Sequence, residues 1–273
     1  MFSRQCGFII TNMKLFVLLT LLAGIAQAQK IVLAGSDTLG AKMVPQLKEK
    51  WVSEGNAVEF EIAAEGSSQA FTTLLAGTAD IGMASRKVKA EELAKFKAAG
   101  KELVEHLAAW DMIAVVVSDK NPISELTLKQ VEGIFTGDFT DWSEVDGNPG
   151  RIFVYTRNTA SGTYKTFQSL AMSNRPYGKN TQKMVEGIAN EVAVNPKGIG
   201  YVGLAYSQKD GLKPLKIDGV SPKPKEKGKY PLSRKLYYYT VGEPRGETTK
   251  FLTWACHSEE AKEVIDKVGF IPN

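Results

Sequence analysis

The sequence predicts an α/β fold with a largely parallel sheet, because one local pattern occurs three times along the chain. In each occurrence a short apolar segment, expected to be a strand, precedes a cluster of glycine and hydroxyl residues and then apolar residues at helical spacing. Two more apolar segments, at 80–84 and 112–117, fit buried strands. Strands that alternate with helices are typical of α/β proteins.

The first occurrence shows the pattern most clearly. A strand at 30–34 leads into the polar cluster 35–38, and the apolar residues that follow at steps of four predict a helix: Leu39, Met43, Leu47 and Trp51. The other two occurrences have strands at 58–63 and 152–155 and polar clusters at 66–68 and 161–163. The segment 135–142 is expected to be a surface turn.

Composition excludes several classes of protein. With 43% hydrophobic and 23% charged residues, the 273-residue chain has the make-up of a folded globular protein rather than a disordered or coiled-coil one. Its net charge of +4 is far below the concentrated positive charge of nucleic-acid-binding proteins, so we expect no nucleic-acid partner. Two Cys and two His give no basis for a zinc, iron–sulfur or disulfide framework. We therefore expect no metal and no cofactor.

Residues 1–28 have the features of a secretory signal peptide. An apolar run at 15–26 follows Lys14 and leads into Ala26-Gln27-Ala28, a spacing of small residues that signal peptidase recognises. The run is shorter than the roughly 20 apolar residues of a spanning helix. We predict cleavage after Ala28 and a mature chain exported to the periplasm, with Cys256 as its single thiol.

The three polar clusters together suggest one anion site. In α/β sheets, ligands bind beyond the carboxyl ends of the strands, and each cluster opens a helix whose free N–H groups attract negative charge. The third cluster adds Arg157, four residues before Ser161, which suits the gripping of a tetrahedral oxyanion. Each cluster taken alone is also explained as an ordinary helix cap that binds nothing.

At this point the residues resemble a known family. The segments AGSDT at 34–38, EGSS at 65–68, ADIGMASR at 79–86 and RNTASGT at 157–163 look like the ligand loops of the periplasmic phosphate-binding proteins of phosphate ABC transporters. Segments at 126–142, 198–202, 230–234 and 269–272 match that family's landmarks in the same order. The resemblance implies a type II periplasmic binding protein fold, with two α/β lobes joined by a hinge of two crossovers around a ligand cleft. It places lobe one at 29–110 and 232–273, and lobe two at 111–231.

The resemblance also implies a function and a set of site residues. The protein would bind inorganic phosphate by hinge closure and deliver it to a membrane permease, as a monomer and without catalysis. The expected ligand-binding residues come from four segments and are Ser36, Asp37, Thr38, Ser67, Ser85, Arg86, Arg157, Ser161, Gly162 and Thr163.

One departure from the family concerns selectivity. Many members place an aspartate near the end of the ADIG segment, where it accepts the proton of hydrogen phosphate, whereas this chain has Ser85 and Arg86 there. Asp37 is the best candidate for that acceptor, although a solvent-facing helix cap explains it equally well. Arg86 is either a second cation for the ligand or the partner of Glu91 or Glu92 in a surface ion pair.

Other functions remain open on the sequence alone. A different tetrahedral oxyanion, such as sulfate, molybdate or tungstate, would suit the same donors. A secreted phosphoester hydrolase would need a base, and only His106 and His257 are available. The segment 198–203 satisfies GxGxxG, but a turn precedes it and no clear helix follows, so we expect no dinucleotide. The family resemblance implies that these residues form a strand instead.

Overall fold

The computed structural model describes residues 29–184 and 187–273. The predicted signal peptide at 1–28 lies outside the described residues. Within the described part of the chain, no helix is long and apolar enough to cross a membrane.

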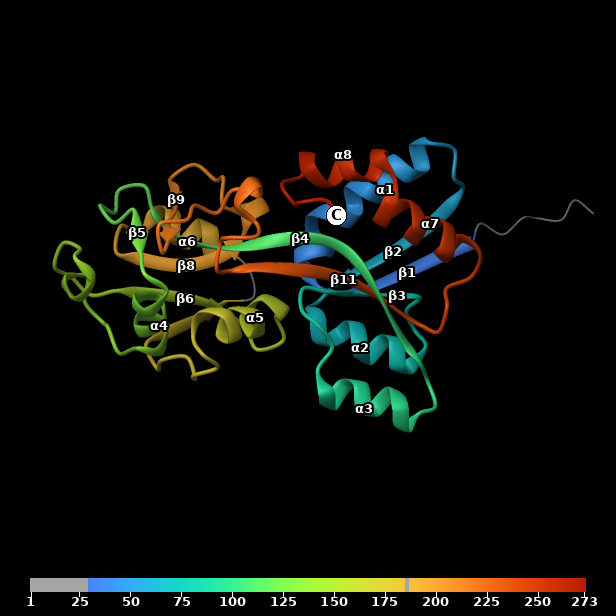
Figure 1. The fold of residues 1–273 in the computed structure, drawn as a ribbon, viewed down its shortest axis with the longest axis horizontal. Coiled ribbons are helices and arrows are strands. Elements are labelled where there is room, and N and C mark those ends of the chain that lie inside the picture. The colour runs from blue at the N-terminus through green and yellow to red at the C-terminus, as the bar shows by residue number, and fades with distance from the viewer. Residues whose placement is uncertain (1–28, 185–186) are drawn as a thin grey trace, which may run out of the picture.

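One curled sheet runs through the whole molecule in the order β2-β1-β3-β11-β4-β8-β6-β7 (Figure 1). At one end, β1 (Gln29–Gly35) pairs in parallel with β2 (Val58–Ala64) and with β3 (Ile81–Ala84). At the other end, β6 (Phe153–Arg157) pairs in parallel with β7 (Thr181–Met184) and with β8 (Gly198–Gly203). The strands predicted at 30–34, 58–63, 80–84 and 152–155 therefore form, in two parallel groups. The sheet as a whole is mixed rather than largely parallel, because antiparallel pairs join the two groups.

Two long antiparallel strands connect these groups. β4 (Leu103–Ser118) pairs with β11 (Ser233–Val241) over its first part, and with β8 and β9 (Leu212–Pro214) over its last part. The strand expected at 112–117 is thus the second half of a 16-residue element. The molecule has two lobes, and the sheet continues from one to the other through β4 and β11, which form the hinge (Figure 1).

Helices cover both faces of the sheet in each lobe. In the first lobe α1 (Val44–Ser53), α7 (Gly246–His257) and α8 (Glu259–Lys267) lie on one face, and α2 (Ser67–Ala76) and α3 (Ala90–Ala98) on the other (Figure 1). The second lobe holds α4 (Leu128–Thr136), α5 (Gly162–Ala171) and α6 (Ile188–Val194). Its remaining short elements are β5 (Glu125–Leu126), η2 (Trp142–Val145), η3 (Leu204–Tyr206), β10 (Lys216–Ile217) and η4 (Pro224–Glu226).

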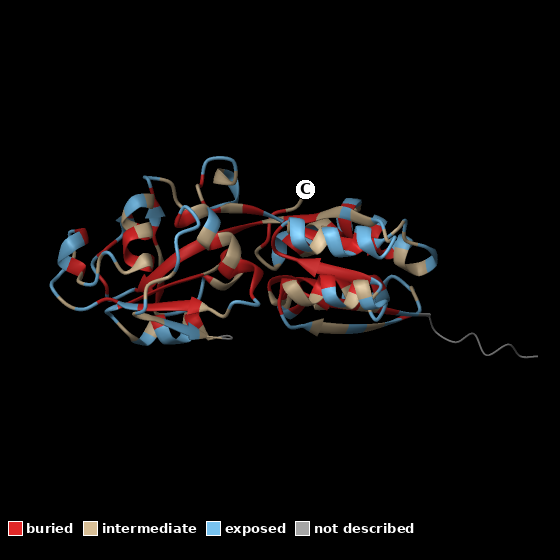
Figure 2. Cartoon of the chain, turned by 90° about the horizontal axis from the view of Figure 1, so that it is seen from below, coloured by how far each residue is buried: buried red, intermediate tan, exposed pale blue. Residues whose placement is uncertain are grey.

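The cores explain why some strands are apolar throughout. In β4, Val115 and Val117 pack with α4 and α5, whereas Ala114 and Val116 pack with α6, so both faces of the strand are buried. Burial of this kind fills the interior of both lobes (Figure 2). In β11, Tyr238 faces one core and its neighbours face another, which makes these tyrosines packing residues.

Two local expectations need correction. The first predicted helix contains a π-helical turn near its start, η1 (Leu39–Met43), in which the Val44 N–H donates to the Leu39 carbonyl. Pro45 explains the widened turn, because proline has no N–H and its ring crowds the carbonyl four residues earlier. The segment 135–142 is not simply a surface turn, because Phe135, in the last turn of α4, is fully buried against Phe167, and Trp142 is buried as well.

Candidate functional site

Backbone hydrogen bonds join the three loops of the first lobe. The Ser36 N–H donates to the Met83 carbonyl at 2.8 Å, and the Gly66 N–H donates to the Gly35 carbonyl at 2.7 Å. Gly35 has φ of +129°, and a Cβ there would lie 2.3 Å from the Met83 oxygen. Only glycine fits this turn, so the chain leaves β1 with Ser36, Asp37 and Thr38 beside the ends of the neighbouring strands.

The fourth loop reaches the same place from the second lobe. A Cβ added to Gly162 would lie 2.1 Å from Ser67 Oγ and 2.3 Å from Ser85 Oγ. The two serine hydroxyls lie 3.2 Å apart, and Ser67 Oγ also accepts the Ser85 N–H at 3.0 Å. Ser161 caps α5 by accepting the Tyr164 N–H. The N-termini of α2 and α5 therefore converge, from opposite lobes, on one buried point.

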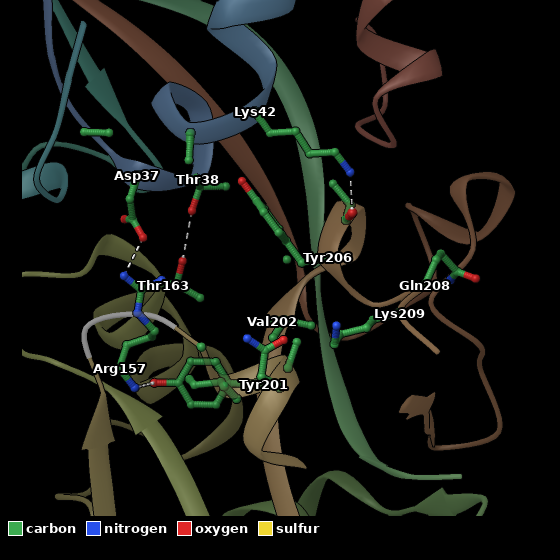
Figure 3. A pocket seen from close by; sticks show the side chains of 18 residues that line it. Asp37, Thr38, Lys42, Arg157, Thr163, Tyr201, Val202, Tyr206, Gln208 and Lys209 are labelled. Atoms are coloured by element: carbon green, nitrogen blue, oxygen red, sulfur yellow. Dashed lines mark hydrogen bonds and ion pairs between the residues drawn. The ribbon is translucent and has the colours of Figure 1, made fainter. Parts of the chain in front are cut away.

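Two further contacts cross between the lobes. Arg157 Nη2 forms an ion pair with Asp37 Oδ2, and the hydroxyls of Thr38 and Thr163 lie 3.2 Å apart (Figure 3). The Arg157 and Asp37 side chains are about one-fifth exposed, at 18% and 21%. Residues separated by more than 100 positions thus meet in pairs, one member from each lobe.

A cavity of about 730 Å³ lies beside these pairs. Asp37, Thr38, Arg157 and Thr163 line one part, and Lys42, Tyr206 and Lys209 extend it (Figure 3). Lys42 Nζ donates to the Ala205 carbonyl at 2.6 Å and lies over the Tyr206 ring. Three cations against one carboxylate give the wall a positive balance that favours an anion.

Several polar atoms here have no partner within the described structure. Ser36 Oγ, Asp37 Oδ1, Arg157 Nε and Tyr206 Oη are buried and make no hydrogen bond to any described residue. Buried polar atoms are normally paired, and each unpaired one costs stability, so their concentration at this place indicates a ligand-binding role. Burial, reinforced by the charges of Asp37 and Asp111, raises the pKa of Tyr206 to about 12, which keeps its hydroxyl protonated.

Of the residues predicted for the site, Arg86 alone has its side chain committed elsewhere. Its guanidinium forms two hydrogen bonds with Glu92, at 2.7 and 2.8 Å, and stacks on Phe71. The structure therefore favours the ion-pair interpretation of Arg86. The others gather at the facing loops: Ser36, Asp37, Thr38, Ser67, Ser85, Arg157, Ser161, Gly162 and Thr163.

Sequence reasoning missed a second ion pair beneath the site. Arg234 lies opposite Asp111 in the β4–β11 ladder, and its Nε and Nη2 donate to Asp111 Oδ2 at 3.0 and 2.6 Å. The two side chains are 3% and 0% exposed. A signal was present, because Asp111 is the single charged residue in the apolar run 107–117 and such a charge requires a partner.

The histidines lie away from this cavity. His106 Nε2 lies 3.0 Å from the Thr240 hydroxyl on the hinge strands, and His257 is exposed at the end of α7. Across residues 29–184 and 187–273, no group of three His, Cys, Asp or Glu side chains is placed to hold a metal ion. The site consists of N–H, hydroxyl and guanidinium donors with one free carboxylate oxygen.

Known proteins share this sequence and architecture. A family model described as a PBP superfamily domain matches residues 23–260. The phosphate-binding protein PstS of Bacillus subtilis is 28% identical over 245 residues, which cover 89% of this chain and 80% of that protein. Its counterpart in Staphylococcus aureus is 30% identical over 247 residues, covering 86% and 73%.

Solved structures agree. A putative phosphate ABC transporter substrate-binding protein from Clostridium perfringens, with bound phosphate, superposes with a TM-score of 0.79 at 30% identity, covering 90% of this chain and all of that one. An ABC-type phosphate transport receptor from Vibrio cholerae gives a TM-score of 0.73 at 27% identity, covering 89% and 100%. These relatives confirm the two-lobed α/β fold and the family resemblance. The chain belongs to the PBP superfamily, among the phosphate-binding proteins of ABC transporters.

Proposed function

We propose that this protein is a binding protein, not an enzyme, which captures inorganic phosphate and delivers it to the permease of an ABC transporter. The observation that carries the proposal is the set of buried, unpartnered atoms at one cavity: Asp37 Oδ1, Arg157 Nε and Tyr206 Oη. The names of the relatives, phosphate-binding protein and phosphate transport receptor, support phosphate as the ligand.

The donors suit a doubly charged oxyanion. Free N–H groups at the starts of α2 and α5 and the Arg157 guanidinium supply charge-assisted hydrogen bonds from opposite lobes. The proposed contacts are the residues that the loops bring together: Ser36, Asp37, Thr38, Ser67, Ser85, Arg157, Ser161, Gly162 and Thr163. Arg86 is left out because Glu92 occupies its guanidinium.

Asp37 supplies the selectivity in this proposal. Arg157 occupies Oδ2 of the carboxylate, which leaves Oδ1 free to accept the proton of hydrogen phosphate. Sulfate carries no proton near neutral pH and would meet Oδ1 as acceptor against acceptor. An unpaired buried charge of this kind is costly, which favours phosphate.

Hinge closure would assemble the site. Lobe one is proposed to comprise 29–110 and 232–273, and lobe two 111–231, with the crossings in β4 and β11. Thr38, Ser67 and Ser85 come from one side and Arg157, Ser161 and Thr163 from the other, so the anion is fully enclosed only when the lobes meet. Every contact made from both sides then contributes to keeping the cleft closed.

The setting proposed is the periplasm, after removal of residues 1–28, with the protein acting as a monomer. Large apolar side chains that are exposed among the described residues stand apart in sequence: Val52, Phe153, Val194 and Val241. Single exposed apolar residues of this kind are ordinary on a monomeric protein, which supports the monomer proposed here. The modest net charge likewise supports a small anion rather than a nucleic acid as ligand.

A thermal-shift panel on residues 29–273 tests the function. A ligand that binds only the folded state raises stability by about 1.4 kcal/mol for each tenfold excess over its dissociation constant. We expect phosphate to give the largest rise in Tm, ahead of sulfate, molybdate and tungstate. A larger rise with one of the other anions would assign that anion instead. Turnover of a chromogenic phosphoester would overturn the assignment as a binding protein.

A further inference from the structure

The buried Arg234 occupies the junction of the hinge and the site. It lies on β11, and its guanidinium uses one side to hold Asp111 on β4, through Nε and Nη2. Asp111 Oδ1 is engaged as well, because it accepts the Leu204 N–H at 3.0 Å. The carboxylate is therefore fixed from two directions, and it fixes the guanidinium in turn.

The other side of the guanidinium reaches the threonines of both lobes. Arg234 Nη1 donates to Thr163 Oγ1 at 2.8 Å, and Nη2 lies 3.5 Å from Thr38 Oγ1. The two hydroxyl oxygens lie 3.2 Å apart, and both residues are buried, at 6% and 3% exposed. One cation on the hinge thus contacts a hydroxyl from each wall of the cleft.

Hydrogen-bond donors decide what this arrangement presents to a ligand. A guanidinium only donates, so Thr163 Oγ1 must accept from Arg234, and its own hydrogen has to point elsewhere. One of the two threonine hydroxyls donates to the other. The remaining O–H hydrogen is left for the cavity that Thr38 and Thr163 line. Without Arg234, Thr163 would be free to turn a lone pair toward the cavity, which an anion would repel.

We propose that Arg234, held by Asp111, is a positioning residue that sets the distance between Thr38 and Thr163 and makes their hydroxyls donate toward the anion. The inference rests on the proposed phosphate function and extends it to a residue that acts through the threonines. Lysine cannot replace arginine in this role, because a single ammonium lacks the planar fork that spans Asp111 and Thr163 together.

The test is a double-mutant cycle read by calorimetry with inorganic phosphate. We expect Arg234→Lys and Thr163→Val each to weaken binding by about tenfold, the equivalent of one hydrogen bond in a buried site. The combined variant should bind about as well as either single variant, because both changes remove the same oriented donor. Thr163→Ser, which keeps the hydroxyl, should retain binding and remain sensitive to Arg234→Lys.

A matched control is available in the first lobe. Arg86 is also a buried arginine paired with a carboxylate, at 8% and 13% side-chain exposure, but it has no contact with either threonine in the described structure. Arg86→Lys should leave the phosphate affinity unchanged. A loss equal to that of Arg234→Lys would mean that any disturbed arginine pair weakens binding, and would overturn the proposal.

Other outcomes are equally decisive. Unchanged affinity in Arg234→Lys, or strictly additive losses in the cycle, would overturn the positioning role while leaving phosphate binding by the wild-type protein intact. A wild-type protein that ignores phosphate would overturn the proposed function and this inference with it. If Arg234→Lys does not fold, Arg234→Met with Asp111→Asn removes both charges together. Thr163→Val should then have no further effect in that background, and a further loss would contradict the proposal.

Discussion

The arginine–aspartate pair at the cleft and the one at the hinge differ in how completely their hydrogen bonds are satisfied. The hinge pair, Asp111 and Arg234, is almost fully buried, and both oxygens of its carboxylate are engaged. The cleft pair, Asp37 and Arg157, is partly exposed and leaves Oδ1 and Nε without described partners. The same residue types therefore serve two purposes. A saturated pair fixes geometry, whereas an unsaturated pair has capacity left for a ligand.

The largest expected effect separates the pairs by stability. Asp111→Asn leaves the Arg234 charge buried without its counter-ion, which should lower the free energy of unfolding by about 3 kcal/mol. Asp37→Asn affects a pair that water can reach, and should lower it by about 1 kcal/mol or less. Urea denaturation without phosphate measures both. Equal losses would show that burial does not distinguish the two pairs.

For the cleft pair, we expect a larger effect on phosphate affinity than on the free energy of unfolding. Arg157→Ala removes charge-assisted hydrogen bonds to the anion, each worth about 1.5–3 kcal/mol, so phosphate binding should weaken by at least about tenfold. Its effect on unfolding in the absence of ligand should be small, because the side chain is partly exposed. Calorimetry and urea denaturation on the same sample give the two values. An unchanged dissociation constant would remove Arg157 from the site.

Selectivity provides a finer distinction within the cleft pair. Asp37→Asn replaces the free acceptor Oδ1 with an amide that can donate, so sulfate should compete with phosphate more effectively than in the wild type. Competition calorimetry at neutral pH measures the ratio of the two affinities. If sulfate remains as poor a competitor in Asp37→Asn, the aspartate is a structural cap and another group selects the ligand.

The smallest expected effect concerns pH at the far end of the hinge strands. Burial lowers the pKa of His106 below its ordinary value of 6.5, with Glu243 opposing the shift and His257 adding to it. As pH falls below about 6.5 the unfolded chain takes up this proton first, so stability is lost until the folded pKa is passed. His106→Gln should flatten that slope, whereas His257→Gln removes only the smallest contribution to the His106 shift and should flatten it less. Urea denaturation at a series of pH values between 5 and 8 compares them.

Much of the site could be predicted because its residues follow local rules. Glycine and hydroxyl residues at strand ends mark the loops, and the helices after 38, 66 and 161 form close to where the apolar spacing places them. The pairing of Arg234 with Asp111 could not be predicted. It depends on the antiparallel register of two strands separated by more than 100 residues, and no local pattern encodes that register.

Side-chain direction limited the rest of the prediction. Arg86 follows a ligand loop in sequence, yet Glu92, six residues later, draws its guanidinium away from the cavity. Likewise, the sequence indicates that Asp37 and Arg157 both belong near an anion, but their contact with each other exists only because the lobes approach. Spacing along the chain identifies the residues, whereas the hinge decides which of them face one another.

The contact of Gly162 with Ser67 and Ser85 has a practical consequence. Because Gly162 has no side chain, the two lobes can contact each other at this position, and a methyl group there would clash with the serines of the opposite lobe. Gly162→Ala would prevent the two lobes from closing fully while leaving every polar side chain of the site in place. The affinity of this variant for the anion would show how much of the binding comes from a single lobe. It would thereby separate recognition of the ligand by one lobe from the added contribution of lobe closure.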